Sequence, residues 1–241
     1  MIILLGETPA AREISEYLQN RAIRFRRMST WTDRDDLSVP SVILDLSHPS
    51  SVKFVSLSKF CEQTGIPYLR FERPETNIPK SSLISQAYSW EEALHRLNER
   101  ISALYREKER QVKVFVTTGS YQLESIVHSS FAGMARFIVR VLPEGHLVQK
   151  CQDLGLHPRD ILAMQGPFSK DINKALFKFY GADIVLTKDS GPAGGTDTKI
   201  SAALELGLEI LLIRKNIVGY GLTINNVSEL ISWIDKNIPK T

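Results

Sequence analysis

Short apolar runs alternate along the chain with longer segments in which apolar residues recur every three or four positions. The runs are rich in Val, Ile and Leu, as buried strands are, and the longer segments are typical of amphipathic helices. Strands that alternate with helices predict parallel sheets with helices on their faces. The predicted strands are Ile2–Leu5, Ile23–Arg27, Ser41–Asp45, Tyr68–Phe71, Leu83–Ala87, Val112–Thr117, Phe137–Val141, Ile161–Met164, Asp183–Thr187 and Glu209–Ile213. The predicted helices are Pro9–Gln19, Val52–Gln63, Trp90–Arg106, Leu123–Ser129, Glu144–Leu154, Lys170–Tyr180, Asp197–Leu206 and Val227–Asn237.

A charged segment without large apolar residues, Glu107–Gln111, separates two halves of this pattern. We place the domain boundary there, with residues 1–108 in an N-terminal domain and residues 109–241 in a C-terminal domain. The fold class is therefore predicted to be α/β, with two Rossmann-like domains that each contain an open parallel sheet, and with a cleft between the domains.

Composition and charge narrow the function classes. Hydrophobic residues make up 43% and charged residues 24% of the chain, and the formal net charge of +3 is too small and too dispersed to indicate nucleic-acid binding. No apolar run approaches the roughly 20 residues that span a bilayer, and the apolar N-terminus has the pattern of a buried strand rather than of a signal peptide. Cys61 and Cys151 lack metal-ligand spacing, so we expect no metal site and a cytoplasmic location.

Small, hydroxyl-bearing or charged residues follow nearly every predicted strand. In an open parallel sheet, ligands bind at the carboxyl ends of the strands. The pattern therefore predicts a ligand site at these ends. The segments concerned are Gly6–Thr8, Asp45–Pro49, Thr117–Ser120, Gln165–Ser169 and Thr187–Gly191.

The segment Thr187–Lys199 carries the clearest chemical signal. Its three glycines allow a close backbone approach to a ligand, and the loop leads into a helix whose N-terminal N–H groups favour phosphate or carboxylate. We expect Thr196 or Asp197 to cap that helix. Lys188 adds a positive charge, and Asp189 is expected either to orient it or to exchange protons. The alternative is a glycine-rich connector with a solvated lysine.

Two shorter segments of the second half allow a binding or a purely structural interpretation. Thr117–Ser120 either presents hydroxyl and N–H groups to an anion or forms a hydroxyl-rich turn. Gln165–Ser169 contains a Gly-Pro turn, and Ser169 either contributes to the site or only caps the following helix.

The first predicted strand lacks the glycine pattern of dinucleotide-binding domains. Gly6–Ala11 contains one glycine where G-x-G-x-x-G is typical. Arg26 and Arg27 end the second strand and are candidates for a ribose 2′-phosphate, with surface charge as the alternative. His48, which Pro49 holds in an extended conformation, is either a cofactor or proton-transfer residue or a structural histidine.

Several of these segments, in one order along the chain, resemble motifs of the precorrin-6A reductase family. Thr187–Lys199 is similar to the family's T-K-D-S-G-x-x-G-G-T-x-x-K, and Gln165–Ser169 is similar to its Q-G-P-F-S. Phe137–Pro143 resembles V-R-x-L-P, Asp45–Pro49 resembles D-A-T-H-P, and Tyr68–Pro74 resembles L-R-x-E-R-P. The resemblance covers most of the chain and is strongest in the second half.

The resemblance implies an oxidoreductase of cobalamin biosynthesis that reduces one carbon–carbon double bond of a tetrapyrrole, precorrin-6A or cobalt-precorrin-6A, to the 6B product. The implied cofactor is NADPH or NADH, with NADPH slightly favoured, and other corrin-pathway enzymes are candidate partners for substrate hand-over. Lys188 or Asp189 is the candidate proton donor, with water as the alternative. The candidate cofactor-binding residues are Gly6, Thr8, Arg26, Arg27, Ser47, His48, Pro49, Ser190, Gly191, Gly194, Gly195 and Thr196. The candidate substrate-binding residues are Arg70, Thr118, Gly119, Ser120, Arg140, Gln165, Gly166, Phe168, Ser169 and Lys199.

Two departures from the family pattern motivate an alternative function. Gly6–Arg12 has the sequence G-E-T-P-A-A-R where the family has G-G-T-x-E-A-R, and only Ser29–Pro40, without glycine, stands where many members have a G-G-F-G-G-like segment. A corrinoid-binding or carrier protein without catalysis is therefore the alternative. A two-domain ligand receptor, similar in shape to solute-binding proteins, is a third hypothesis.

Overall fold

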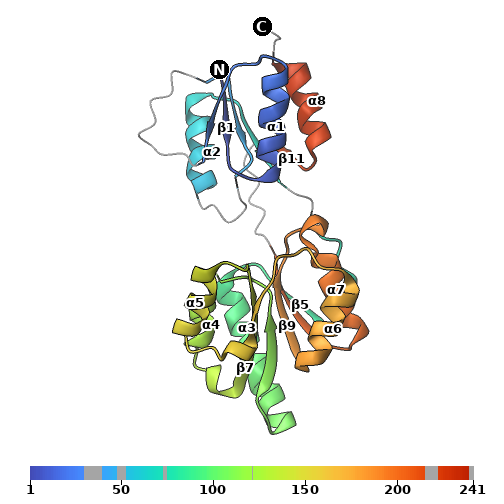
Figure 1. Cartoon of the computed structure of the whole chain (residues 1–241). Helices are drawn as coiled ribbons and strands as arrows, with labels where there is room; N and C mark the ends of the chain where they lie inside the picture. Colours follow the sequence, from blue (N-terminus) through green and yellow to red (C-terminus); the bar gives the residue numbers. More distant parts are fainter. Residues whose placement is uncertain (30–39, 48–52, 73–74, 121, 215–221, 239–241) are drawn as a thin grey trace. The chain divides into compact units, whose positions relative to one another are not determined.

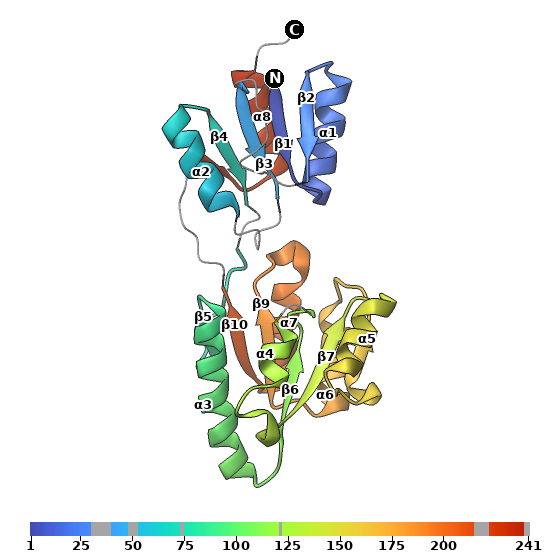
Figure 2. The ribbon, with the colours of Figure 1, turned by 90° about the vertical axis from the view of Figure 1, so that its left-hand side faces the viewer.

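The computed structural model describes residues 1–29, 40–47, 53–72, 75–120, 122–214 and 222–238. The chain divides into two compact units, which we call unit 1 (Met1–Pro74 with Ile217–Thr241) and unit 2 (Glu75–Asn216). Each unit is a parallel sheet flanked by helices, as Figures 1 and 2 show. The predicted α/β class with two open parallel sheets is confirmed. The placement of the units relative to each other is not determined, so the cleft between them stays a prediction.

Unit 1 contains a five-stranded parallel sheet in the order β11-β4-β3-β1-β2. Helices α1 (Pro9–Asn20) and α8 (Val227–Asn237) contribute to the apolar core on one face, and α2 (Lys53–Thr64) contributes to the core on the other. The central strands β1 and β3 are buried along their whole length because both of their faces are covered. The strands are β1 (Ile2–Leu5), β2 (Phe25–Met28), β3 (Val42–Asp45), β4 (Tyr68–Phe71) and β11 (Leu222–Ile224).

Unit 2 contains a six-stranded parallel sheet in the order β5-β10-β9-β6-β7-β8. Helices α3, α4 and α5 share an apolar core with one face of the sheet, and α6 and α7 share a core with the other face. The strands are β5 (Ile84–Ala87), β6 (Val112–Val116), β7 (Ala135–Val141), β8 (Ile161–Ala163), β9 (Ile184–Lys188) and β10 (Glu209–Ile213). The helices are α3 (Trp90–Lys108), α4 (Leu123–Val127), α5 (Gly145–Asp153), α6 (Lys170–Tyr180) and α7 (Thr196–Glu205).

The division between the units differs from the boundary predicted at Glu107–Gln111. That segment is a tight turn from α3 into β6, with Glu109 in the left-handed conformation at φ 51°. Its cations bind the carboxylate at the start of β9, because Lys108 Nζ lies 2.6 Å and Arg110 Nη1 2.8 Å from Asp183. The charges therefore anchor a turn inside unit 2 instead of marking a linker.

The two halves of the sequence each contribute a strand to the other half's sheet, which also moves the division between the units away from the predicted boundary. The strand predicted at Leu83–Ala87 pairs with β10 in unit 2, and the C-terminal helix α8 packs in unit 1. Unit 1 is completed by β11, a three-residue strand that pairs with β4. A strand of this length is too short for a recognisable apolar period, and the sequence analysis missed it.

Candidate functional site

The sheet of unit 2 has a topological switch point between β6 and β9. After β6 the chain continues outward to β7 and β8, whereas after β9 it continues outward to β10 on the other side. The loops that follow β6 and β9 therefore diverge and leave a crevice at the carboxyl ends of the strands, which is where ligands bind in open α/β sheets. Thr117 and Lys188 mark these two ends.

A cavity of about 390 Å³ lies at this switch point. The structure brings together nine residues predicted for the site, while Asn173 and Met164 are lining residues that the sequence analysis did not single out. The predicted residues that line the cavity are Thr118, Gly119, Arg140, Gly166, Phe168, Lys188, Gly194, Gly195 and Lys199.

Three cations from different elements line the cavity. Arg140 lies near the end of β7, Lys188 is the last residue of β9, and Lys199 lies in the first turn of α7. Arg140 Nη1 donates a hydrogen bond of 3.0 Å to Asn173 Oδ1, and its guanidinium lies 4.6 Å from the ring centre of Phe168. None of these three cations forms an ion pair within 4.0 Å with a carboxylate of the described residues.

Burial and mutual repulsion disfavour the charged forms of these cations. Burial lowers the pKa of Arg140 to about 10, and it also lowers the pKa of Lys188. The pKa of Lys199 falls to about 8 because the side chain is buried and because the charges of Arg140 and Lys188 are close, although Asp189 and Asp197 act in the opposite direction. An anion bound in this cavity relieves the cost of keeping these charges together.

The loop from β9 to α7 is held by its own hydrogen bonds. Ser190 N donates to Thr196 Oγ1 at 3.0 Å, and Ser190 Oγ lies 3.3 Å from Gly194 O. A Cβ atom at Gly194 would lie 2.1 Å from Ser190 Oγ, so this tight loop requires glycine there. Ser190, Gly191 and Thr196 thus shape the loop and are not among the cavity-lining residues.

The predicted cap of α7 is wrong. The N-cap is Gly195 in the left-handed conformation, and no side chain caps the helix. The hydroxyl of Thr196 accepts from the loop instead, because Thr196 is already the first helical residue. Among the described residues, no side chain accepts a hydrogen bond from the first N–H groups of α7, which lie beside a cavity lined by three cations.

Asp189 is buried, with 4% of its surface exposed, and its carboxylate is occupied. Thr76 donates to it from both its hydroxyl (2.7 Å) and its backbone N–H (3.2 Å), and Gly191 N donates at 2.9 Å. Arg214 Nε lies 3.8 Å away. These partners indicate that Asp189 holds the segments around it in place, and its predicted proton-transfer role stays a prediction.

The segment Gln165–Ser169 both contributes to the cavity and caps a helix, the two roles that the sequence left open. Gly166 and Phe168 line the cavity, whereas Ser169 caps α6 by accepting from Ile172 N at 3.3 Å, and Gln165 and Ser169 are exposed outside the lining. Ser120, in the segment after β6, is likewise not a lining residue.

Unit 1 has its own switch point, between β1 and β3, where Gly6 meets Leu46. Gly6 has φ +113°, and a Cβ atom there would lie 2.5 Å from Leu46 O, so only glycine fits. Thr8 caps α1 by accepting from Ala11 N at 3.2 Å, and its hydroxyl donates to Leu46 O at 2.9 Å. Three predicted cofactor residues follow β3. Ser47 lies at the carboxyl end of that strand, and His48 and Pro49 lie outside the described residues.

A cavity of about 480 Å³ beside this switch point is lined by Glu7, Arg12, Arg27 and Ser29. Arg27 Nε donates to Gly6 O at 3.2 Å, which ties the end of β2 to the end of β1. Neighbouring strand residues project to opposite faces of a sheet, and Arg26 is accordingly not among the lining residues. Arg12, on α1, was not among the predicted site residues, although it matches the arginine that ends the family's G-G-T-x-E-A-R motif.

Arg70 was predicted to bind substrate carboxylates, and its surroundings oppose that role. It is 2% exposed, and its Nη1 lies 2.6 Å from Asp45 Oδ2 and 3.0 Å from Ser47 Oγ. The ion pair with Asp45 is buried, and the predicted role of Arg70 in substrate binding stays a prediction. Arg70 joins the carboxyl ends of β3 and β4 inside unit 1.

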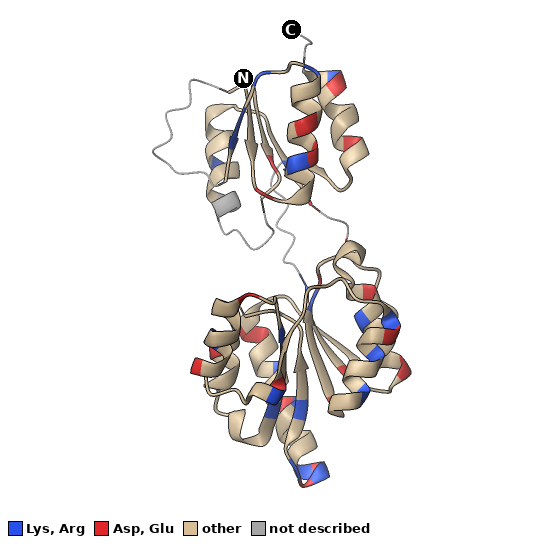
Figure 3. Cartoon of the chain, in the orientation of Figure 1, with Lys and Arg blue, Asp and Glu red and all other residues tan. Residues whose placement is uncertain are grey.

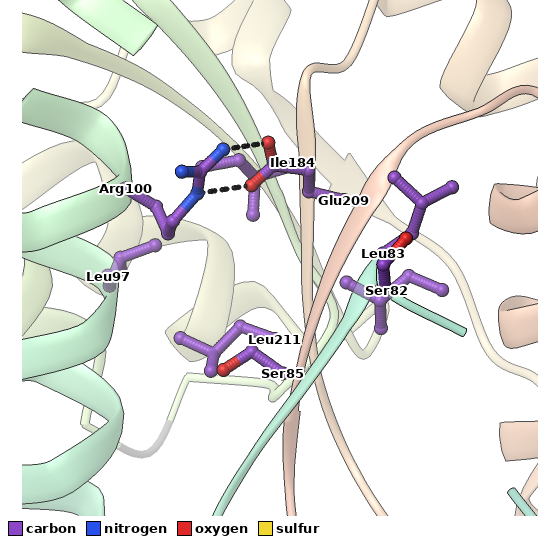
Figure 4. Close-up of a pocket in the computed structure, with 9 residues that line it drawn as sticks. Ser82, Leu83, Ser85, Leu97, Arg100, Ile184, Glu209 and Leu211 are labelled. Atoms are coloured by element: carbon purple, nitrogen blue, oxygen red, sulfur yellow. Dashed lines mark hydrogen bonds and ion pairs between the residues drawn. The ribbon is translucent and has the colours of Figure 1, made fainter. Parts of the chain in front are cut away.

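A further cavity, of about 260 Å³, lies at the amino ends of β5, β9 and β10 (Figure 4). Arg100 and Glu209 pair with each other across it, so its charges are internally satisfied. It contains none of the predicted site residues and lies at the opposite end of the strands from Lys188.

Charge and hydropathy of the structure agree with the composition. Lys and Arg are scattered over both units and interspersed with Asp and Glu (Figure 3). Among the helices described, none combines the length and apolar character needed to cross a bilayer. The described residues also contain no cluster of three or more His, Cys, Asp or Glu side chains suited to a metal ion.

Comparison with known proteins identifies similar sequences and a solved structure of similar fold. The family described as precorrin-6x reductase CbiJ/CobK matches residues 4–235. A cobalt-precorrin-6A reductase of Priestia megaterium is 33% identical over 196 residues, which cover 78% of this chain and 71% of that protein. Its namesake in Methanothermobacter thermautotrophicus is 34% identical over 199 residues, which cover 81% of this chain and 62% of the relative. The solved structure of CobK precorrin-6A reductase has the same fold, with a TM-score of 0.70 and 19% identity over 98% of this chain and 97% of that one.

Proposed function

The chain belongs to the precorrin-6x reductase family, and we propose that it uses a reduced nicotinamide to reduce one carbon–carbon double bond of precorrin-6A or cobalt-precorrin-6A. Membership makes it an oxidoreductase of corrin biosynthesis that acts on a precorrin tetrapyrrole. The non-catalytic carrier alternative is not favoured, because the relatives that match are reductases.

The observation that carries the proposal is the set of unpaired cations at the switch point of unit 2. A precorrin has many carboxylates around its ring, and Arg140, Lys188 and Lys199 converge on one cavity without a carboxylate partner among the described residues. Phe168 and Met164 add an apolar surface to the same cavity, which suits the ring. We assign these residues to substrate binding, with Gly194 and Gly195 allowing a close approach of the loop.

The residues at the switch point of unit 1 fit a dinucleotide. Arg12 and Arg27 bring two guanidiniums to a cavity of about 480 Å³ beside the end of β1, where Gly6 allows the close approach of Leu46. Arginine at the end of the second strand suits the 2′-phosphate of NADPH, where NADH sites have a carboxylate. We therefore propose NADPH, although Glu7 in the same cavity opposes a phosphate. When bound, the reduced nicotinamide supplies a hydride from its C4 carbon.

We place the enzyme in the cytoplasm, a proposal that the two buried free cysteines, Cys61 and Cys151, support. Exchange of substrate and product with other enzymes of the pathway is part of the same proposal.

An anaerobic assay of the purified chain tests the function. Mixing precorrin-6A or cobalt-precorrin-6A with NADPH or NADH is expected to give enzyme-dependent loss of the nicotinamide absorbance. Arg140→Ala is expected to raise KM by about tenfold or more, since a charge-assisted bond contributes about 1.5–3 kcal/mol. The exposed Arg159→Ala is the matched control and should leave KM unchanged. Absence of oxidation with every combination of substrate and cofactor would contradict the proposal.

A further inference from the structure

Lys199 combines burial with an unpartnered charge. Its side chain is 6% exposed, yet it lines the cavity at the switch point of unit 2. The Nζ atom of Lys199 forms no hydrogen bond and no ion pair with any of the described residues. A buried ammonium group without partners is costly. The fold nevertheless holds it in place, because α7 begins at Thr196 and Lys199 N donates to Gly195 O at 3.3 Å.

The groups that face Lys199 set its acidity. Arg140 from β7 and Lys188 from β9 disfavour the ammonium form, while Asp189 from the loop and Asp197 from α7 favour it. Burial has the largest effect, and the resulting pKa is about 8. A general acid is most effective when its pKa lies near the working pH, because it is then both protonated and able to release the proton.

The other charged residues of the cavity are less suited to donate a proton. Arg140 does not lose its proton in a protein. Lys188 is also partly desolvated, which lowers its pKa, but its side chain remains exposed at the end of β9, so water can solvate its charge as it cannot for Lys199. Asp189 is saturated by donors from Thr76 and Gly191, and its carboxylate does not line the cavity. Among the described residues that line the cavity, Lys199 alone combines burial with a transferable proton.

We infer that Lys199 donates the proton that completes reduction of the ring double bond, an inference that rests on the proposed function. A hydride adds to one carbon of the bond, and the displaced electron pair moves to the neighbouring carbon. That carbon forms a bond to hydrogen as one Nζ–H bond of the ammonium group breaks, which leaves Lys199 as a neutral amine. The nicotinamide is left oxidised, and the amine regains its proton from water after product leaves.

Lys199→Met and Lys199→Arg test the role, because methionine keeps the buried stem and arginine keeps the charge without a transferable proton. We expect kcat/KM of the wild type to fall by about tenfold per pH unit above a pH of about 8. Both variants should lose about 100-fold or more in kcat and should lack this alkaline limb. Lys199→Ala should regain activity with added ethylamine, which replaces the missing amine.

Controls separate proton donation from binding and folding. Substrate affinity, followed by tryptophan fluorescence, is expected to stay within about tenfold in Lys199→Arg, and circular dichroism should show the folded spectrum. The exposed Lys150→Met should behave as the wild type. If Lys199→Met changes KM alone, or retains the alkaline limb, the proton-donor role is wrong while the reductase assignment stands. A wild-type chain that oxidises no nicotinamide would instead refute the proposed function, and the role of Lys199 with it.

Discussion

Replacing Lys199 by methionine is expected to stabilise the protein at neutral pH. The pKa of Lys199 falls from 10.5 to about 8 in the folded state. Each tenfold change in proton affinity corresponds to about 1.4 kcal/mol, so the buried charge costs on the order of 3 kcal/mol below pH 8. Methionine has a similar length and no charge. Its substitution should recover most of that free energy and raise the melting temperature by several degrees, at about 2–4 °C per kcal/mol.

The pH dependence of this effect has a definite sign. Between pH 8 and 10.5 the unfolded chain binds a proton at Lys199 that the folded chain does not bind, so the wild type gains stability relative to the variant as the pH rises. The stability difference between Lys199→Met and the wild type should therefore be largest at pH 7 and fall to roughly a quarter of that value at pH 10. Urea denaturation at both pH values measures it, with Lys150→Met as the exposed control. A Lys199→Met protein that is no more stable than the wild type at pH 7 would refute the reasoning.

Three further predictions follow from the contacts described above. Gly6→Ala should destabilise the protein by about 2–4 kcal/mol in urea denaturation, because its Cβ would meet a carbonyl oxygen at 2.5 Å; Gly133→Ala, with open space around it, should change stability little. Arg27→Ala should weaken NADPH binding by about tenfold or more in calorimetry and leave NADH binding unchanged, whereas Arg26→Ala should affect neither; equal losses for both arginines would contradict the 2′-phosphate assignment. Asp189→Asn should lower stability by about 1–3 kcal/mol and lower kcat without changing its pH profile, since it disturbs buried hydrogen bonds but removes no proton donor; a shifted profile would restore Asp189 as an acid.

The sequence predicted best those strands whose burial on both faces leaves a continuous run of apolar residues. β1 and β3 lie between two helical layers, so β1 is apolar throughout and β3 is apolar up to its terminal Asp45. The cavity residues of unit 2 were found for a related reason. Most of them lie at the carboxyl ends of strands or in the loops that follow, and the parallel order brings those ends to one edge.

Pairing between distant segments was outside the reach of local patterns. The residues around Ile84 do not indicate that β5 pairs with β10, and those around Leu222 do not indicate that β11 pairs with β4. Roles that depend on partners were missed for the same reason. Asp189 follows a strand and Arg70 lies near the end of one, which made both of them candidates. Only the fold shows that Thr76 donates a hydrogen bond to Asp189 and that Asp45 pairs with Arg70.

The exchange of strands has a consequence for the order of events during synthesis. Unit 2 is one continuous stretch of chain, but the sheet of unit 1 needs β11, and its core needs α8, both of which follow unit 2. Until the ribosome has released those last residues, the edge of β4 is unpaired and the apolar surface of α1 lacks the helix that covers it. Unit 1 begins before unit 2 in the chain and is completed after it, so a ribosome that stalls after unit 2 leaves a nascent chain with an open sheet edge.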